Sequence, residues 1–228
     1  MSTIATNIAK VGARIREAAQ ASARDAESVG LLAVSKTQPA EAIREAFGAG
    51  VRDFGENYLQ EALDKQTALT DLALHWHFIG PIQSNKTKAI AEHFDWVHSV
   101  DRLKIAQRLS EQRPDALGPL NICLQVNVSG EASKSGCAPE AVAGLAEAIA
   151  ELPRLRLRGL MTIPAPTEDP TEQRRAFARL RQLKEALGPD LDTLSMGMSQ
   201  DLEAAIAEGA TWVRIGTALF GARDYGRP

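Results

Sequence analysis

The chain has 228 residues, 44% of them hydrophobic and 24% charged, and its 26 Lys and Arg against 29 Asp and Glu leave a formal net charge of −3. This composition is typical of a globular protein with a hydrophobic core, and the slightly negative net charge gives no indication of a basic surface that binds nucleic acid. The absence of a secretion signal, of a membrane-spanning apolar segment and of a cysteine framework predicts a cytoplasmic protein that acts on a small molecule.

Apolar periodicity predicts an alternation of helices and strands. Residues 3–26 form the first helix, with Ile4, Ile8 and Val11 on one face. Residues 30–35 are a short apolar run typical of a buried parallel strand. All expected strands lie near 30–35, 51–55, 74–80, 95–99, 120–128, 156–161, 191–195 and 211–216. The helices between them lie near 39–48, 57–69, 84–93, 101–112, 138–150, 170–187 and 199–208, with a short closing helix at 217–223.

This order predicts an α/β fold, a single (β/α)₈ TIM barrel with an extra N-terminal helix, as one domain over residues 1–228. The alternative is an open doubly wound sheet, which normally carries a Gly-rich phosphate turn after its first strand. Here Ser35-Lys36-Thr37-Gln38 follows the first strand, and the Gly-rich turn follows the last. The barrel is therefore favoured.

Unusual side chains collect at the carboxyl ends of the expected strands, where barrels place their chemistry. Lys36 is the most informative of these residues. An amine desolvated at a barrel mouth suits a Schiff-base nucleophile. The alternative is a strand-end lysine that extends into solvent.

Two loops near the end of the chain combine glycine with hydroxyl groups. Ser195, Gly197 and Ser199 follow strand seven, and Gly216 with Thr217 follows strand eight. Barrels frequently bind phosphate with these two loops, so we expect an anion site, although both hydroxyl residues would also serve as ordinary helix caps.

Arg214 and His77 complete the candidate residues on the strands. Arg214 is expected to point into the barrel, where either a pyridine ring nitrogen or the carboxylate of Glu56 could be its partner. His77 is expected to pack beside a cofactor ring. His75 and His77 share one side of strand three, but no spacing supplies further metal ligands, so no metal site is predicted.

Six ordered motifs resemble the pyridoxal phosphate homeostasis proteins, a family with the fold of the alanine racemase N-terminal domain. Pro81 departs from the leucine expected at that place. The motifs are Ala33-Val34-Ser35-Lys36-Thr37, Phe54-Gly55-Glu56-Asn57-Tyr58, Trp76-His77-Phe78-Ile79-Gly80, Gln83-Ser84-Asn85-Lys86, Ser195-Met196-Gly197-Met198-Ser199-Gln200-Asp201 and Val213-Arg214-Ile215-Gly216-Thr217.

The resemblance implies binding of pyridoxal 5′-phosphate (PLP), with Lys36 forming the Schiff base and Arg214 facing the pyridine nitrogen. Asn57 and His77 match residues that line the ring. The phosphate-binding positions match Ser195, Gly197, Ser199, Gly216 and Thr217, and Met161 and Met196 complete the expected cofactor site.

The resemblance further implies a non-catalytic monomer that buffers or supplies PLP, serves PLP-dependent apo-enzymes and affects amino-acid metabolism indirectly. A guanidinium cannot give its proton to the ring nitrogen, which weakens the cofactor as an electron acceptor. Two alternatives stay open: a low-activity PLP-dependent amino-acid racemase and a cofactor-free Schiff-base aldolase. A secondary PLP site on Lys86, Lys88 or Lys134 is a further possibility.

Overall fold

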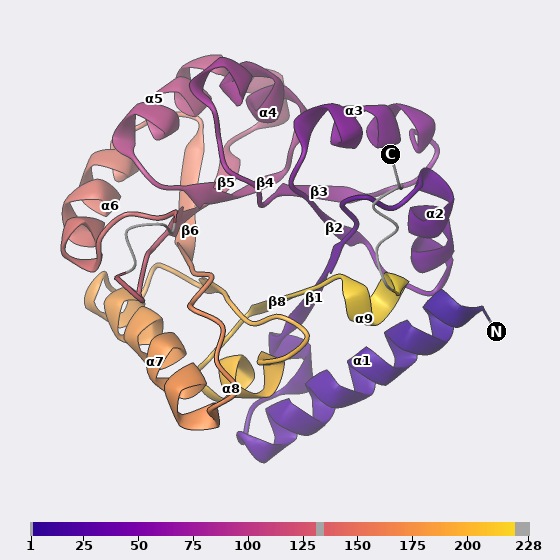
Figure 1. Cartoon of the computed structure of the whole chain (residues 1–228). Coiled ribbons are helices and arrows are strands. Elements are labelled where there is room, and N and C mark those ends of the chain that lie inside the picture. The colour runs from indigo at the N-terminus through magenta and orange to yellow at the C-terminus, as the bar shows by residue number, and fades with distance from the viewer. Residues whose placement is uncertain (1, 131–134, 222–228) are drawn as a thin grey trace, which may run out of the picture.

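A closed barrel of eight parallel strands forms the centre of the computed structural model, which describes residues 2–130 and 135–221. Each strand pairs with the next along the chain, and β8 returns to pair with β1. Figure 1 looks along the barrel, with the helices in a ring around it. The strands are β1 (Gly30–Val34), β2 (Asp53–Glu56), β3 (His75–Phe78), β4 (Trp96–Val100), β5 (Leu120–Gln125), β6 (Leu155–Met161), β7 (Thr193–Ser195) and β8 (Trp212–Ile215).

Helices follow the strands in strict alternation, so the predicted barrel is confirmed and the open sheet is wrong. The helices are α1 (Thr3–Ala21), α2 (Ala40–Gly48), α3 (Leu59–Ala68), α4 (Thr87–His93), α5 (Leu103–Gln112), α6 (Val142–Ala150), α7 (Pro170–Ala186), α8 (Leu202–Ala207) and α9 (Thr217–Phe220). The extra helix α1 packs against α8 and α9. Within the described residues, no helix combines the length and apolar character that a bilayer crossing requires.

Some predicted elements end earlier than the sequence pattern indicates. Helix α1 stops at Ala21 instead of residue 26, because Ala23 has a φ of 53° and cannot continue a right-handed helix. Strand β5 stops at Gln125 instead of residue 128, because the backbone beyond it pairs with a returning loop through Cys137. The predicted closing helix ends at Phe220, and residues 222–223 lie outside the described part of the chain.

Aromatic and polar side chains fill the amino-terminal end of the barrel. The fully buried His77 ring stacks on Trp96, with centroids 5.6 Å apart, and Trp212 meets it edge-on at 5.3 Å. Gly30 makes room for Trp212, since a Cβ there would lie 2.5 Å from the indole ring. Trp96 and Trp212 each begin their strand, so the barrel is packed with rings at this end, and any ligand cavity belongs at the other.

The junction between β6 and β7 depends on a glycine, which gives a test of the fold. A Cβ at Gly159 would lie 1.8 Å from the Thr193 carbonyl oxygen on the paired strand. We expect Gly159→Ala to lower the free energy of unfolding by about 3 kcal/mol, because the strands must separate. Gly144→Ala is the matched control: this exposed site on α6 has open space, and the change should raise stability by about 0.8 kcal/mol. Urea unfolding would measure the free energy of unfolding of both variants. Equal values for Gly159→Ala and Gly144→Ala would contradict the role given to Gly159.

Candidate functional site

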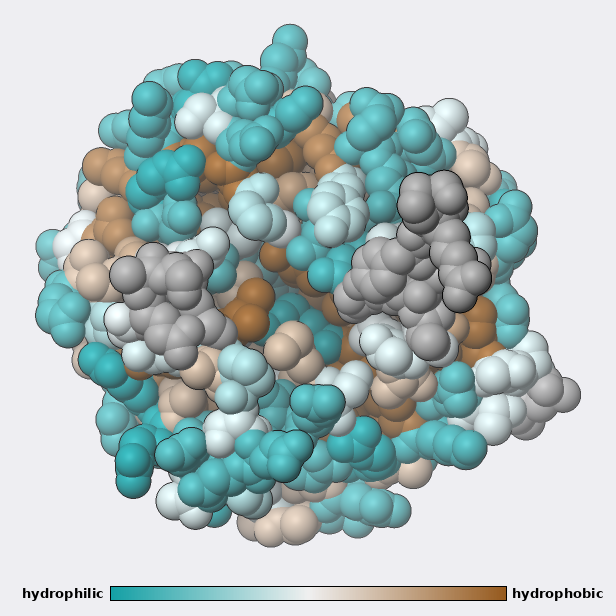
Figure 2. Space-filling view, viewed as in Figure 1, coloured by the Kyte–Doolittle hydropathy of each residue, from teal (hydrophilic) through white to brown (hydrophobic). Residues whose placement is uncertain are grey.

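A cavity of about 770 Å³ opens at the carboxyl ends of the strands. Figure 2 shows the hollow near the centre of this face. Among the described residues, its wall carries three cationic side chains, Lys36, Arg214 and Arg14, and one carboxylate, Asp201. The volume is ordinary for a small-molecule site, and the charge balance favours an anionic ligand.

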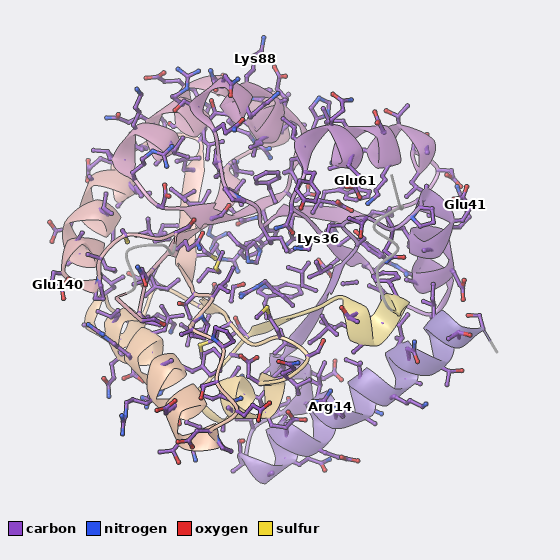
Figure 3. The ribbon with its side chains drawn as sticks, viewed as in Figure 1. Arg14, Lys36, Glu41, Glu61, Lys88 and Glu140 are labelled. Atoms are coloured by element: carbon purple, nitrogen blue, oxygen red, sulfur yellow. The ribbon has the colours of Figure 1, made fainter. Side chains whose placement is uncertain are left out.

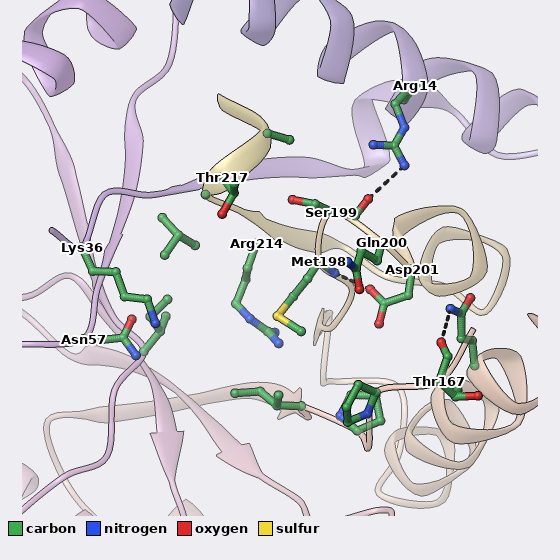
Figure 4. Close-up of a pocket in the computed structure, with 18 residues that line it drawn as sticks. Arg14, Lys36, Asn57, Thr167, Met198, Ser199, Gln200, Asp201, Arg214 and Thr217 are labelled. Atoms are coloured by element: carbon green, nitrogen blue, oxygen red, sulfur yellow. Dashed lines mark hydrogen bonds between the residues drawn. The ribbon is translucent and has the colours of Figure 1, made fainter. Parts of the chain in front are cut away.

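Lys36 and Asn57 lie beside each other on one wall of the cavity, as Figure 4 shows. Asn57 directly follows β2, and Lys36 lies two residues beyond the end of β1. Gly80 lets the loop after β3 pass close to Asn57, because a Cβ there would lie 2.3 Å from the Asn57 carbonyl oxygen. Asn57 Oδ1 is buried and has no hydrogen-bond partner in the described part of the chain. The wall therefore holds an amine beside an unsatisfied amide oxygen.

A buried ionic cluster supports this wall from behind. Lys65 on α3, only 6% exposed, donates from Nζ to the Ser35 carbonyl oxygen at 2.7 Å, to Glu56 Oε1 at 2.7 Å and to Glu61 Oε1 at 2.5 Å. Ser35 Oγ also donates to Glu56 Oε1, at 2.6 Å. Burial raises the pKa of Glu56, while Lys65 and Ser35 oppose that rise. The cluster ties α3 to the ends of β1 and β2.

The same cluster fixes the turn after Lys36. Thr37 has a φ of 63°, an unfavourable value for a side chain branched at Cβ, and its backbone N–H donates to Glu61 Oε1 at 2.5 Å. Figure 3 places Glu61 and Lys36 on the same side of the barrel. Both backbone neighbours of Lys36 are thus hydrogen-bonded to the cluster, which holds the lysine in place at the mouth.

Arg214 on β8 is a cation buried in the barrel, 4% exposed. Its Nη1 donates to Ser195 Oγ and its Nη2 to the Thr162 carbonyl oxygen, both at 2.8 Å. Burial lowers its pKa to about 10, which still leaves it protonated at pH 7. The alternative partner Glu56 is wrong, because the bonds of that carboxylate go to Lys65 and Ser35.

The loop after β7 is tightly folded against α8. Gly197 has a φ of 95°, and a Cβ there would lie 2.5 Å from the Ala205 Cβ. The Met198 N–H donates to Asp201 Oδ1 at 2.6 Å. Burial raises the pKa of Asp201, while that hydrogen bond and the charge of Arg214 lower it. The loop is therefore shaped by its own contacts and brings Met198 and Asp201 to the cavity wall.

The extra helix α1 holds the loops after β7 and β8. Arg14 donates from Nη2 to the Ser199 carbonyl oxygen at 3.1 Å and from Nε to Glu203 Oε1 on α8 at 2.9 Å. Asn7 donates to the Leu219 carbonyl oxygen on α9 at 3.0 Å. Helix α1 thus contributes Arg14 to the cavity and braces both loops, although it lies outside the barrel strands.

The loop after β8 completes the wall with Gly216, Thr217 and Ala218. Gly216 precedes α9, and the first N–H groups of a helix have no partner within it. Together with the Ser199 hydroxyl, these groups can donate hydrogen bonds to an anion. The cavity can thus bind an aldehyde through an amine, an acceptor through a guanidinium, and an anion through the two loops.

Comparison with known proteins gives the family. The profile of the alanine racemase N-terminal domain matches residues 6–224. A pyridoxal phosphate homeostasis protein of Pseudomonas aeruginosa is 77% identical over 228 residues, covering 100% of this chain and 99% of that protein. Its namesake in Escherichia coli K12 is 55% identical over 236 residues and covers 100% of both. The chain belongs to the pyridoxal phosphate homeostasis protein family.

Solved structures agree with this family membership. PipY of Synechococcus elongatus PCC7942, solved with PLP bound, superposes with a TM-score of 0.82 at 41% identity and covers 96% of this chain and 100% of that one. An alanine racemase of Corynebacterium glutamicum has a TM-score of 0.71 at 19% identity and covers 99% of this chain and 63% of that one. The second likeness shows the barrel fold alone. The resemblance predicted from the sequence motifs is confirmed.

The structure divides the predicted cofactor residues into two groups. Those on the cavity wall are Lys36, Asn57, Ser199, Arg214, Gly216 and Thr217. The others are buried outside that wall: His77, Met161, Ser195, Met196 and Gly197. The Nε2 and Nδ1 atoms of His77 are hydrogen-bonded inside the barrel, to Asp53 at 3.1 Å and to His98 at 2.9 Å.

Several wall residues were missed by sequence reasoning. Asp201 belongs to the motif that carries Ser195 and Ser199, and its place just before α8 could have indicated it. Arg14 on α1 and Gln173 on α7 gave no such signal, because each reads as an ordinary polar helix residue. Their position at the mouth follows only from the packing of these helices around the barrel.

The described residues offer little support for other sites. They contain no group of three or more His, Cys, Asp or Glu side chains placed to hold a metal ion. Lys88 is 71% exposed at its side chain and points outward in Figure 3. Lys86 lies near it at the start of α4, while Lys134 lies outside the described residues.

The buried cluster behind Lys36 gives a test of the site. We expect Lys65→Met to lower the free energy of unfolding by about 3–5 kcal/mol at pH 8, because Glu56 is left as an unpaired buried charge. Burial already raises the Glu56 pKa, and loss of Lys65 raises it further. A carboxyl group whose pKa is higher in the folded state than in the unfolded state stabilises the fold at pH values below its unfolded pKa. This contribution is lost as the pH rises through its folded pKa. The loss of unfolding free energy caused by Lys65→Met should therefore be smaller at pH 5 than at pH 8.

Urea unfolding at both pH values measures this difference. Lys88→Met is the matched control, because this exposed lysine forms only a 3.9 Å surface pair with Glu92. It should change stability by less than about 0.5 kcal/mol. A pH-independent deficit in Lys65→Met would contradict the role given to Glu56.

Proposed function

We propose that this protein binds pyridoxal 5′-phosphate and takes part in intracellular PLP (vitamin B6) homeostasis. The observation that carries the proposal is the presence of Lys36 and Arg214 in one cavity with the loops after β7 and β8. An amine can form a Schiff base with an aldehyde, and the loops can bind a phosphate. Full-length relatives carry this name, and PipY holds PLP.

The wall residues fit the parts of PLP. Lys36 would hold the aldehyde carbon, and Asn57, whose Oδ1 is buried and unsatisfied within the described chain, would contact the ring. Arg214 would donate to the ring nitrogen. Ser199, Gly216 and Thr217 would bind the phosphate through hydroxyl and backbone groups.

The buried residues of the predicted site would act from behind this wall. Ser195 accepts a hydrogen bond from Arg214, and Gly197 allows the loop after β7 to approach α8. Met161, Met196 and His77 are fully buried and pack the interior on which the wall rests. In the proposed site these residues shape the cavity.

Arg214 limits the chemistry that the site supports. When bound, PLP supplies a reactive aldehyde and a ring that can withdraw electrons. Burial lowers the pKa of Arg214 only to about 10, so it stays protonated at neutral pH. It would donate a hydrogen bond to the ring nitrogen without transferring the proton. The site thereby favours holding the cofactor over using it as an electron acceptor.

The surroundings of Lys36 support a non-catalytic role. A racemase needs a second base on the opposite face of its substrate. Asp201 is the one carboxylate on the described wall, and its Oδ1 already accepts the Met198 N–H. Tyr58 is 54% exposed and does not line the described wall, while Tyr225 lies outside the described residues. We therefore favour a carrier over the low-activity racemase.

A carrier needs reversible attachment. A Schiff base forms with loss of water and is hydrolysed by water, so Lys36 could both take up PLP and release it. In this proposal the protein acts as a cytoplasmic monomer that buffers PLP, supplies PLP-dependent apo-enzymes and so affects amino-acid metabolism indirectly.

The attachment of PLP to Lys36 is tested by reducing the bound cofactor and locating the covalently labelled residue. We expect the protein incubated with PLP to absorb visible light, and borohydride reduction followed by peptide mass mapping to place the pyridoxyl group on Lys36. Lys36→Ala should lose both the absorbance and the label, because the amine is gone.

Lys88→Ala is the matched control and should behave as the unaltered protein, since this lysine lies on the surface. A label that survives in Lys36→Ala and is lost in Lys88→Ala would instead locate a surface site. A protein that stays colourless and unlabelled would overturn the proposal and favour the cofactor-free aldolase.

The absence of catalysis is tested by proton exchange. We expect the PLP-loaded protein, mixed with L-alanine in deuterated water, to incorporate deuterium at Cα no faster than free PLP does, because the one carboxylate on the described wall, Asp201, is engaged by the Met198 N–H. Mass spectrometry of the amino acid measures this. Faster exchange that depends on Lys36 would favour the racemase.

A further inference from the structure

A chain of hydrogen bonds runs through the closed end of the barrel to the cavity. Asp53 Oδ1 lies 3.1 Å from His77 Nε2, His77 Nδ1 lies 2.9 Å from His98 Nε2, and His98 Nδ1 lies 2.8 Å from Ser195 Oγ. Arg214 Nη1 donates to the same Ser195 Oγ at 2.8 Å. His77, His98 and Ser195 are fully buried. The chain thus connects the first residue of β2 to a side chain of the cavity wall.

The two ends of the chain fix its direction. A guanidinium only donates hydrogen bonds, and an ionised carboxylate only accepts them. Burial alone would raise the pKa of Asp53, but the hydrogen bonds from His77 and His75 lower it, and the net shift is downward. Asp53 is therefore ionised at neutral pH.

Each hydrogen bond in the chain then has only one possible donor. His77 Nε2–H donates to Asp53, so Nδ1 of a neutral His77 must accept. His98 Nε2–H fills that acceptor, and its own Nδ1 accepts from the Ser195 hydroxyl. Ser195 Oγ keeps a lone pair toward Arg214. Every proton in the chain has one position.

The surroundings keep both histidines neutral. Burial lowers the pKa of His77, and burial with the charges of His77 and Arg214 lowers the pKa of His98 well below its usual value. Asp95 is the other carboxylate near His77, and its Oδ2 already accepts the Trp76 N–H at 2.8 Å. Because Arg214 does not release its proton, the chain cannot deliver one to the cavity. The hydrogen-bond chain therefore acts by orienting the Arg214 side chain.

We propose that His98 and His77 are positioning residues that, through Ser195, hold the Arg214 guanidinium in its orientation at the cavity, with Asp53 setting the direction of every hydrogen bond. This inference rests on the proposed function in one respect: the group that benefits from the orientation is PLP, through its ring nitrogen. The order of the protons is a property of the protein without PLP, and it can be tested separately.

The proton order is tested by nitrogen NMR of the PLP-free protein labelled with ¹⁵N in its histidine rings. We expect His77 and His98 to be protonated on Nε2 and unprotonated on Nδ1 at neutral pH. Asp53→Asn should mix the two tautomers, because an amide can donate as well as accept. His75→Gln is the matched control: His75 touches the same Asp53 oxygen at 3.1 Å but lies outside the chain, with its side chain 61% exposed. A proton on Nδ1 of either buried histidine in the unaltered protein would overturn the proposal.

The consequence for the cavity is tested by PLP binding. His98→Phe removes both links, and we expect about tenfold weaker PLP binding, equivalent to the loss of one hydrogen bond to a charged group, and a shifted visible absorption band. Borohydride should still attach the label to Lys36. His98→Gln keeps one donor and one acceptor and should recover most of the affinity, while His75→Gln should bind as the unaltered protein does.

The outcomes separate the two proposals. An unaltered protein that takes up no PLP, yet shows the expected tautomers, overturns the proposed function and leaves the directed chain standing. Normal PLP affinity and an unshifted band in His98→Phe overturn the positioning role and leave the proposed function standing. Should His98→Phe fail to fold, PLP binding by Asp53→Asn decides the same question: its mixed tautomers should weaken binding and shift the band, and normal binding would overturn the positioning role.

Discussion

The burial of the Arg214 guanidinium is the constraint on which the rest of the site depends. A charge inside a barrel is costly unless its donors are satisfied. Two of them are satisfied by Ser195 at the end of β7 and by the Thr162 carbonyl after β6. The group also lines the cavity. Residues at the ends of β6 and β7 thus offset part of the cost of burying the charge, and a ligand that accepts hydrogen bonds would satisfy further donors.

The neighbouring wall, after β1 and β2, also buries a cation, with a different set of residues. Lys65 is nearly as buried as Arg214 and is neutralised by Glu56 and Glu61, which belong to β2 and α3. Both sets of contacts form before any ligand arrives, because Lys65 is held by two carboxylates and Arg214 by a hydroxyl and a carbonyl oxygen. Lys36, Asn57 and Arg214 therefore line a cavity whose shape is already set, so binding need not order the protein first.

The fold and the main site residues could be predicted because their signals are local. Apolar periodicity identified each strand, and Lys36, Asn57 and Arg214 stand out as polar residues where strands end. Lys65 and His98 carried no such signal: one reads as an ordinary helix lysine and the other as a strand histidine. Their roles depend on which atoms of neighbouring strands and helices they meet. Arg14 was missed for the same reason, since only the docking of α1 brings it to the mouth.

The docking of α1 has a consequence for how the protein is made. Asn7 and Arg14 are synthesised well before their partners Leu219 and Ser199, which lie 212 and 185 residues further along the chain. The barrel also closes only when β8 reaches β1. Synthesis proceeds from the N-terminus, so α1 and β1 can meet the loops after β7 and β8 only once β8 has been made. The wall of the cavity is therefore complete only after the barrel closes.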